Sequence, residues 1–285
     1  MIDFLLLGVA FAGSLLAGII DLKTTEVPDW IPYAMGTIGI LANITKSILS
    51  GSYIPIAYSA AVGLGYLGFG FLLYYLGQWG GGDAKILSAI GFLIPTFSTG
   101  KIFFPFYIGF LFNVFFVGAI YMIAYILVLS FINRGIWKSF FKGMAGIRKP
   151  AILYSGLAVL LAAALFVYLS AFRFGLFPVD FAVKFSLFVL LIVSGMFLLW
   201  RFAKTVEDVG FKKRIPLAKL KEGDVILESK IWEGLTKKQV DEIKKSGKRY
   251  VWIKEGVRFT MAFPLALLFT ILVGEGFVWL LKLVG

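Results

Sequence analysis

The chain has 285 residues and contains neither cysteine nor histidine. Without cysteine it cannot form disulfide bonds, thiolate zinc sites or cysteine nucleophiles. Without histidine it cannot form serine–histidine triads, and it lacks the usual ligand of catalytic zinc. Any chemistry must therefore depend on carboxylates, lysines, hydroxyls or the backbone, so we expect no metal and no cofactor.

Charged residues are also scarce, at 15% of the chain, whereas 60% of the residues are hydrophobic. A water-soluble domain could not cover so much apolar surface. Because a helix needs roughly 20 apolar residues to cross a membrane, we searched for long apolar runs. Eight runs are candidates, at 4–20, 30–49, 54–77, 83–97, 102–132, 151–172, 179–202 and 259–282. The sequence therefore predicts an all-α polytopic membrane protein with six to eight transmembrane helices. No basic segment precedes the first run, so we expect a retained span and not a cleaved signal peptide.

The basic residues indicate the orientation of the spans. The segment 133–149 carries five Lys/Arg and no acid, and 201–258 carries sixteen Lys/Arg against nine Asp/Glu. Two spans separate these segments, so both lie on one side, which the positive-inside rule assigns to the cytoplasm. Counting back one span at a time places 78–82 and 21–29 on the same side. The net charge of +12 thus reflects topology and contact with membrane lipids. No nucleic-acid partner is expected, because no aromatic-interleaved basic motif accompanies the charge.

Four regions follow from this pattern. Residues 1–132 form a transmembrane core, 133–203 add further spans after a basic cytoplasmic loop, 204–258 form a soluble basic domain, and 259–285 form a last transmembrane helix. Within the soluble part, Thr236 and Gln239 have the spacing of a capping box and Gly247 suits a helix stop. Residues 225–227 and 250–253 are typical of short strands, with a turn at 221–224. We expect a small cytoplasmic α+β insert that binds anionic lipid or docks substrate.

Two aspartates stand out among the acids expected at the inner face. Asp21 ends the first apolar run, where the helix dipole disfavours negative charge, and ionisable groups at membrane depth are usually functional. Asp83 begins the fourth run after three glycines; it could be an N-cap, as is expected for Asp29 after Pro28. Two carboxyls sharing one proton can hydrolyse a peptide: one activates water and the other polarises the carbonyl. Asp21 and Asp83 are therefore the candidate catalytic pair.

The residues around Asp83 suggest how a substrate could approach. Gly80, Gly81 and Gly82 would let another backbone come close without obstruction by side chains. Lys85 lies two residues beyond Asp83 and points about 200° away from it on a helix. It is a candidate contact for substrate or lipid phosphate, or an anchor at the inner leaflet.

These motifs resemble those of a known family. GGGDAK at 80–85 is similar to the G-x-G-D-x-K signature of the membrane aspartyl proteases that process type IV prepilins and archaeal preflagellins (archaellins). DLKTTEVPD at 21–29 is similar to the family's first aspartate motif. The resemblance covers about residues 1–130 and implies that Asp21 and Asp83 are the catalytic dyad. It also implies removal of a short basic leader, just before the substrate's hydrophobic segment, at the cytoplasmic face of the cell membrane. Family members that N-methylate the product carry a cysteine-tetrad zinc region, so methyl transfer is not expected here and the archaeal type is closer.

Other interpretations stay open at this point. Paired acids near a broken helix also occur in proton-coupled transporters and channels. A non-catalytic subunit of a pilus or archaellum assembly would be equally apolar. Signal-peptide-peptidase and presenilin-like enzymes share G-x-G-D, but their first aspartate lies inside a span next to tyrosine, whereas Asp21 is followed by Leu-Lys-Thr-Thr.

Overall fold

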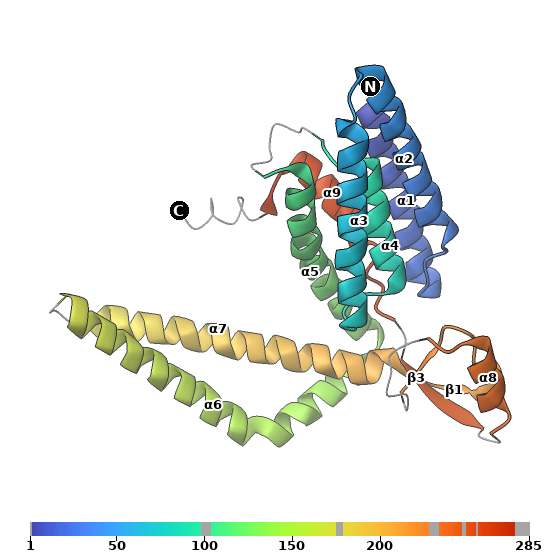
Figure 1. Ribbon diagram of the computed structural model, residues 1–285. Coiled ribbons are helices and arrows are strands. Elements are labelled where there is room, and N and C mark those ends of the chain that lie inside the picture. The colour runs from blue at the N-terminus through green and yellow to red at the C-terminus, as the bar shows by residue number, and fades with distance from the viewer. Residues whose placement is uncertain are drawn as a thin grey trace. The chain divides into compact units, whose positions relative to one another are not determined.

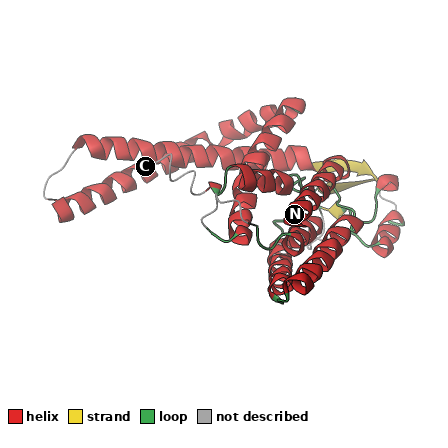
Figure 2. Ribbon diagram, turned by 90° about the horizontal axis from the view of Figure 1, so that it is seen from above, coloured by secondary structure: helices red, strands yellow, loops and turns green. Residues whose placement is uncertain are grey.

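The computed structural model of the chain (Figure 1) describes residues 2–97, 104–174, 179–227, 234–246, 249–254 and 256–276. In this described part of the chain helices dominate, and the strands form one small sheet (Figure 2). The chain divides into two compact units. Unit 1 comprises Met1–Tyr125, Leu220–Gly247 and Lys254–Gly285, and unit 2 comprises Ile126–Lys219 and Lys248–Ile253. The predicted fold class, a helical polytopic membrane protein with a small α+β insert, is confirmed.

The core of unit 1 is a bundle of helices that run side by side (Figure 1). Its helices are α1 (Ile2–Thr24), α2 (Trp30–Ser50), α3 (Ile54–Tyr75), α4 (Gly81–Leu93), the larger part of α5 (Phe106–Ile132) and α9 (Ala262–Leu272). The short helix α4 packs against α1, α2 and α3, and α1 also packs against α9. Most of α4 is buried, including its only acid, Asp83. The candidate motif thus lies on the most enclosed helix of the unit.

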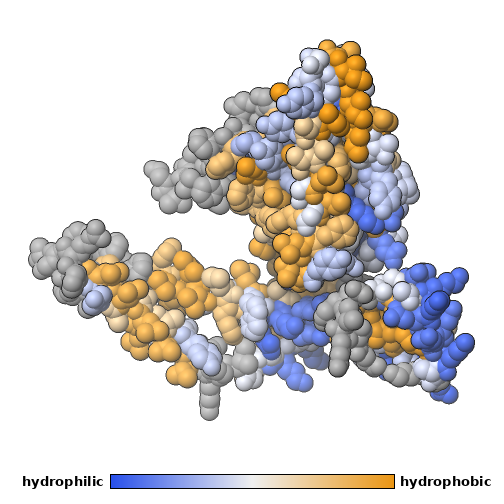
Figure 3. Space-filling model, viewed as in Figure 1, coloured by the Kyte–Doolittle hydropathy of each residue, from blue (hydrophilic) through white to orange (hydrophobic). Residues whose placement is uncertain are grey.

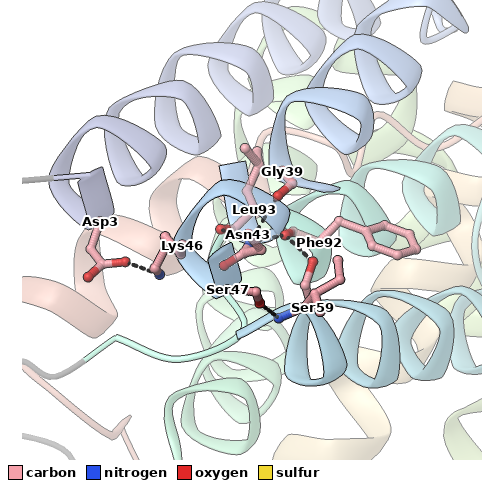
Figure 4. Close-up of polar contacts among 9 residues, drawn as sticks. Asp3, Gly39, Asn43, Lys46, Ser47, Ser59, Phe92 and Leu93 are labelled. Atoms are coloured by element: carbon pink, nitrogen blue, oxygen red, sulfur yellow. Dashed lines mark hydrogen bonds and ion pairs between the residues drawn. The ribbon is translucent and has the colours of Figure 1, made fainter. Parts of the chain in front are cut away.

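Side chains of α2 and α3 cap the C-terminal end of α4 (Figure 4). The last carbonyls of a helix have no partner within the helix, and water is not available to them in a bilayer. The carbonyl of Phe92 accepts hydrogen bonds from Asn43 Nδ2 at 2.9 Å and from Ser59 Oγ at 2.7 Å. Nearby, Lys46 of α2 forms an ion pair with Asp3 of α1 (Figure 4). The bonds from Asn43 and Ser59 to Phe92 hold the end of α4 in position against α2 and α3.

Within the described residues, four helices are long and apolar enough to cross a membrane: Ile2–Thr24, Ile54–Tyr75, Phe106–Ile132 and Leu187–Phe211. The runs predicted at 83–97 and 259–282 correspond to shorter described helices, α4 with 13 residues and α9 with 11. Large apolar side chains such as Leu41, Leu64 and Leu72 stay exposed on the outer faces of the bundle. Figure 3 shows apolar side chains over the helices and hydrophilic ones over the segment with α8 and the strands. The chain is a multi-pass membrane protein, and its number of spans stays a prediction.

In unit 2, α6 (Arg134–Phe174) and α7 (Val179–Val206) pack together as a helical pair. The segment 134–149, predicted as a loop, is helical and forms the first part of α6; that part of the prediction was wrong. The reason is an apolar stripe at helical spacing, in which Trp137 and Phe140 pack their rings on Phe202 of α7, with centroids 5.2 and 5.4 Å apart. The segment is therefore helical because its packing against α7 outweighs the unfavourable helix propensity of its glycines.

The predicted α+β insert is present. It contains a π-helical turn at Glu207–Phe211, β1 (Lys212–Pro216), a 3₁₀ turn at Leu217–Lys219, β2 (Val225–Ile226), α8 (Lys237–Lys244) and β3 (Tyr250–Lys254). The strands belong to one sheet, in which β1 and β3 are neighbours. The capping box is confirmed: the Thr236 amide donates to Gln239 Oε1 at 2.8 Å, and the Gln239 amide donates to Thr236 Oγ1 at 3.4 Å. Gly247, the predicted helix stop, lies outside the described residues.

Candidate active site

Asp21 and Asp83 converge on one residue of unit 1, Thr260. The backbone N–H of Thr260 donates to Asp21 Oδ2 at 3.1 Å, and its hydroxyl donates to Asp83 Oδ1 at 2.8 Å. All three side chains are buried, with exposed fractions of 4% for Asp21, 5% for Asp83 and 1% for Thr260. The two acids therefore lie at the same end of the bundle and close to each other, as an enclosed carboxyl pair.

The start of α4 determines where the Asp83 side chain lies. The helix begins after Gly80, so that Asp83 is its third residue and not its N-cap. Its Oδ2 accepts a hydrogen bond from the Gly80 amide at 3.0 Å, which satisfies a backbone donor that would otherwise lack a partner. The helix N-terminus also stabilises a negative charge there. Asp83 thus has a structural contact through one oxygen and faces Thr260 with the other.

Asp21 lies in the last turn of α1, which extends to Thr24. The residue after the helix, Thr25, has a φ of 63°, a left-handed conformation that β-branched residues rarely adopt. The amide of Thr25 donates to the Asp21 carbonyl at 2.8 Å, and the Thr24 hydroxyl donates to the Ile20 carbonyl at 2.9 Å. This abrupt stop leaves the Asp21 carboxyl buried beside the segment that precedes α9.

Thr260 was not predicted from the sequence. It lies 239 residues from Asp21 and 177 from Asp83, in the turn before α9. The only local signal is a hydroxyl residue near the start of the last apolar run, and that pattern is typical of a helix N-terminus. Its role in the site depends on the packing of α9 against α1, which no local pattern indicates.

The three glycines before Asp83 differ in how closely other groups approach them. A Cβ on Gly82 would lie 2.8 Å from Cβ of Val27, in the loop between α1 and α2. A Cβ on Gly80 would lie 3.2 Å from Asp83 Oδ2, whereas one on Gly81 would reach only the ring of Tyr74, at 3.8 Å. Gly82 therefore permits close packing of α4 on the α1–α2 loop. Of the three, Gly81 has the most room for an approaching backbone.

Lys85 pairs with an acid of the first motif. Its Nζ lies 2.6 Å from Asp29 Oδ1 and 5.6 Å from the centroid of the Tyr33 ring. Asp29 occupies the N-cap position of α2, as predicted, but its side chain makes no capping hydrogen bond. The ion pair replaces that contact, because Lys85 of α4 reaches across to the start of α2. It links the two motifs at a point beside the dyad.

This ion pair should make a small, measurable contribution to stability. We expect a double-mutant cycle of Lys85→Met and Asp29→Asn to give a coupling of about 0.2–1 kcal/mol, because the pair is partly exposed. Thermal unfolding in detergent, followed by tryptophan fluorescence, would measure it. Strictly additive effects of the two substitutions would show that the pair contributes nothing.

Aromatic side chains enclose the site on one side. Trp79, directly before the glycines, packs its ring on Phe115, Phe259 and Phe263, with centroid distances of 5.4 to 5.8 Å. Phe259 is the neighbour of Thr260, so the cluster joins the two segments that carry Asp83 and Thr260. Among the described residues, no group of three or more acidic side chains is placed as metal ligands would be.

Comparisons with known proteins agree with the motifs. Residues 8–123 match the type IV leader peptidase family. A preflagellin peptidase of Methanococcus voltae is 34% identical over 99 residues, which is 35% of this chain and 40% of that relative. A preflagellin peptidase of Methanocaldococcus jannaschii is 33% identical over 98 residues, covering 34% and 40% of the two chains.

A prepilin peptidase of Methanothermobacter thermautotrophicus is 24% identical over 95 residues, or 33% of this chain and 25% of that protein. The chain thus spans less than half the length of each of these relatives. The matches to the family and to the preflagellin peptidases agree with the resemblance predicted from the two aspartate motifs. That resemblance is confirmed for residues 8–123, which contain Asp21 and Asp83 and are similar to the type IV leader peptidases.

Proposed function

We propose that this chain is a membrane-embedded aspartic endopeptidase that removes the short basic leader of preflagellins or type IV prepilin-like proteins. The observation that carries the proposal is the convergence of Asp21 and Asp83 on Thr260. A buried pair of carboxyls, each held by a hydrogen-bond donor, is the arrangement that peptide hydrolysis without a metal or a covalent intermediate requires. The family match over residues 8–123 and the named relatives support the same activity.

In the proposed reaction the dyad holds one proton between its two carboxyls. The ionised carboxyl takes a proton from a water molecule, whose oxygen attacks the carbonyl carbon of the scissile peptide. The protonated carboxyl donates to the carbonyl oxygen, and a tetrahedral intermediate forms. When the C–N bond breaks, the leaving nitrogen takes up a proton from one carboxyl, and a hydroxyl of the intermediate gives its proton to the other carboxyl as the new carboxyl product forms. The dyad then again holds one proton.

The position of the dyad in the bundle favours a protease over a transporter. Asp21 is in the last turn of α1 and Asp83 is in the first turn of α4. Acids that carry ions across a membrane lie near its midplane, where both sides can reach them in turn. Acids at helix ends can instead meet a peptide that enters from the aqueous phase. By the positive-inside rule that phase is the cytoplasm, which is also where a basic leader would be retained. Methyl transfer is not part of the proposal.

Leader removal by the purified protein would test this function. Wild-type protein in detergent is mixed with an archaeal preflagellin that carries its leader, and the products are analysed by mass spectrometry. We expect a single cut just before the hydrophobic segment. A substrate whose leader lysines and arginines are replaced by glutamine serves as the control and should be cut more slowly. Intact substrate, together with proton flux through reconstituted vesicles, would instead support a transporter.

A further inference from the structure

We propose that Thr260 is a positioning residue that holds the two carboxyls of the dyad in their working arrangement. The inference rests on the proposed peptidase activity and extends the site beyond residues 8–123, the part that matches the family. Thr260 donates through two different groups: its backbone N–H to Asp21 and its hydroxyl to Asp83. Because both donors belong to one residue, each carboxyl is oriented relative to the other.

The chemistry of the two donors explains why such a residue is needed. Two buried carboxyls at close range repel each other whenever both are ionised. A hydrogen bond to an ionised acceptor is stronger than one between neutral groups, so each donor of Thr260 favours the ionised state of the oxygen it contacts. A threonine can supply both bonds without adding a charge to the site. An arginine or lysine in this place would hold both acids ionised and remove the shared proton.

The backbone around Thr260 is held by contacts that do not involve the acids. Gly18 of α1 packs against Met261, the residue after Thr260: a Cβ at Gly18 would be only 2.9 Å from Cα of Met261. The Tyr121 hydroxyl of α5 donates to the carbonyl of Arg258 at 2.8 Å, and Arg258 Nη1 donates to the Tyr125 hydroxyl at 2.7 Å. Contacts from α1 and α5 thus hold the turn before α9 on both sides of Thr260. A residue held in this way can impose its geometry on the acids.

Among the described residues, Arg258 and Tyr121 are titratable groups that interact electrostatically with the dyad. Both are left unchanged in the variants below, so a change in the pH–rate profile reports on the hydroxyl of Thr260.

The test compares three threonine variants of the full-length protein. Thr260→Val keeps the shape and the N–H but removes the hydroxyl, Thr260→Ser keeps the hydroxyl, and Thr45→Val is the control. Thr45 is exposed on α2, and its hydroxyl bonds only the carbonyl of Leu41 in its own helix. For Thr260→Val we expect kcat for leader cleavage to fall about 10- to 100-fold, the effect of one lost hydrogen bond to a charged group. Its KM should change by less than about threefold, because the substrate does not touch the hydroxyl.

The pH–rate profile and the serine variant separate positioning from mere packing. Loss of a donor to Asp83 makes its ionised form less stable, so the acidic limb of the profile should move to higher pH in Thr260→Val. Thr260→Ser should restore kcat to within about threefold of wild type and restore the profile. A wild-type kcat and profile in Thr260→Val would overturn the inference. So would a serine variant as impaired as the valine variant, since the methyl group would then be what matters.

A spectroscopic measurement keeps this inference separate from the proposed function. Infrared titration of the carboxyl bands follows ionisation of buried acids whether or not the protein cleaves anything. Wild type and Thr260→Val should differ in the pH at which these bands change, and Thr45→Val should match wild type. If wild type cleaves no leader but the bands shift, the peptidase function fails and the positioning role stands. If the bands are unchanged in Thr260→Val, the positioning role fails by itself.

Discussion

Replacing Asp83 by asparagine is expected to lower the rate of leader cleavage by about 10³-fold or more, because general acid–base catalysis by the dyad is lost. Asparagine has the shape of aspartate and fits the contacts present. Its oxygen can accept from the Gly80 amide, and its NH₂ group can donate to the Thr260 hydroxyl, which also accepts. The variant should therefore fold, so the loss reports on the missing ionisable group. Asp21→Asn should have an equal effect, since its oxygen can still accept from the Thr260 amide.

The effects of Asp21→Asn and Asp83→Asn on the cleavage rate should not be additive. When two groups act as one unit, removing either costs about as much as removing both, so the double variant should be no slower than each single one. Asp29→Asn is the matched control, because Asp29 also belongs to the first motif but pairs with Lys85 outside the dyad. Its rate should stay within about threefold of wild type. Cleavage at the wild-type rate by a folded Asp21→Asn or Asp83→Asn protein would refute the proposed mechanism.

Gly39→Ala is expected to destabilise the bundle by about 3 kcal/mol, at the upper end of the range for overpacking a core. A Cβ at Gly39 of α2 would lie 2.6 to 2.7 Å from backbone atoms of Phe92 and Leu93, at the end of α4. Backbone atoms cannot rotate away, so α2 and α4 would have to move apart. That movement would also break the bonds from Asn43 Nδ2 to the Phe92 and Leu93 carbonyls (Figure 4).

Gly36→Ala provides the control within the same helix. A Cβ at Gly36 would lie 3.9 Å from its nearest neighbour, the ring of Phe92, which is an ordinary contact. Alanine there should be neutral or stabilise α2 by up to about 1 kcal/mol, since alanine favours helix over glycine. Thermal unfolding followed by the fluorescence of the seven tryptophans would compare the two variants. Equal midpoints for Gly39→Ala and wild type would show that α2 and α4 do not approach so closely.

Features that depend on residues close together in the sequence could be predicted, whereas features that depend on contacts between distant helices could not. Asp21 and Asp83 could be identified because each lies in a short motif at the end of an apolar run. The capping box at Thr236 was identified for the same reason, since its two members are three residues apart. The helical start of α6 was missed because the stripe formed by Trp137 and Phe140 is stabilised by Phe202 of another helix. The pairing of Lys85 with Asp29 depends likewise on two helices meeting.

The sequence alone determined that this is a helical membrane protein with no histidine or cysteine chemistry, and that two aspartates lie at the ends of apolar segments. Composition and local periodicity suffice for those conclusions, because each residue contributes to them independently of the rest. Only the tertiary structure showed that Thr260 contacts both acids, that Gly82 packs against Val27, and that Lys85 pairs with Asp29. Such contacts join residues far apart in the chain, and they form only when the helices pack, so no local pattern encodes them.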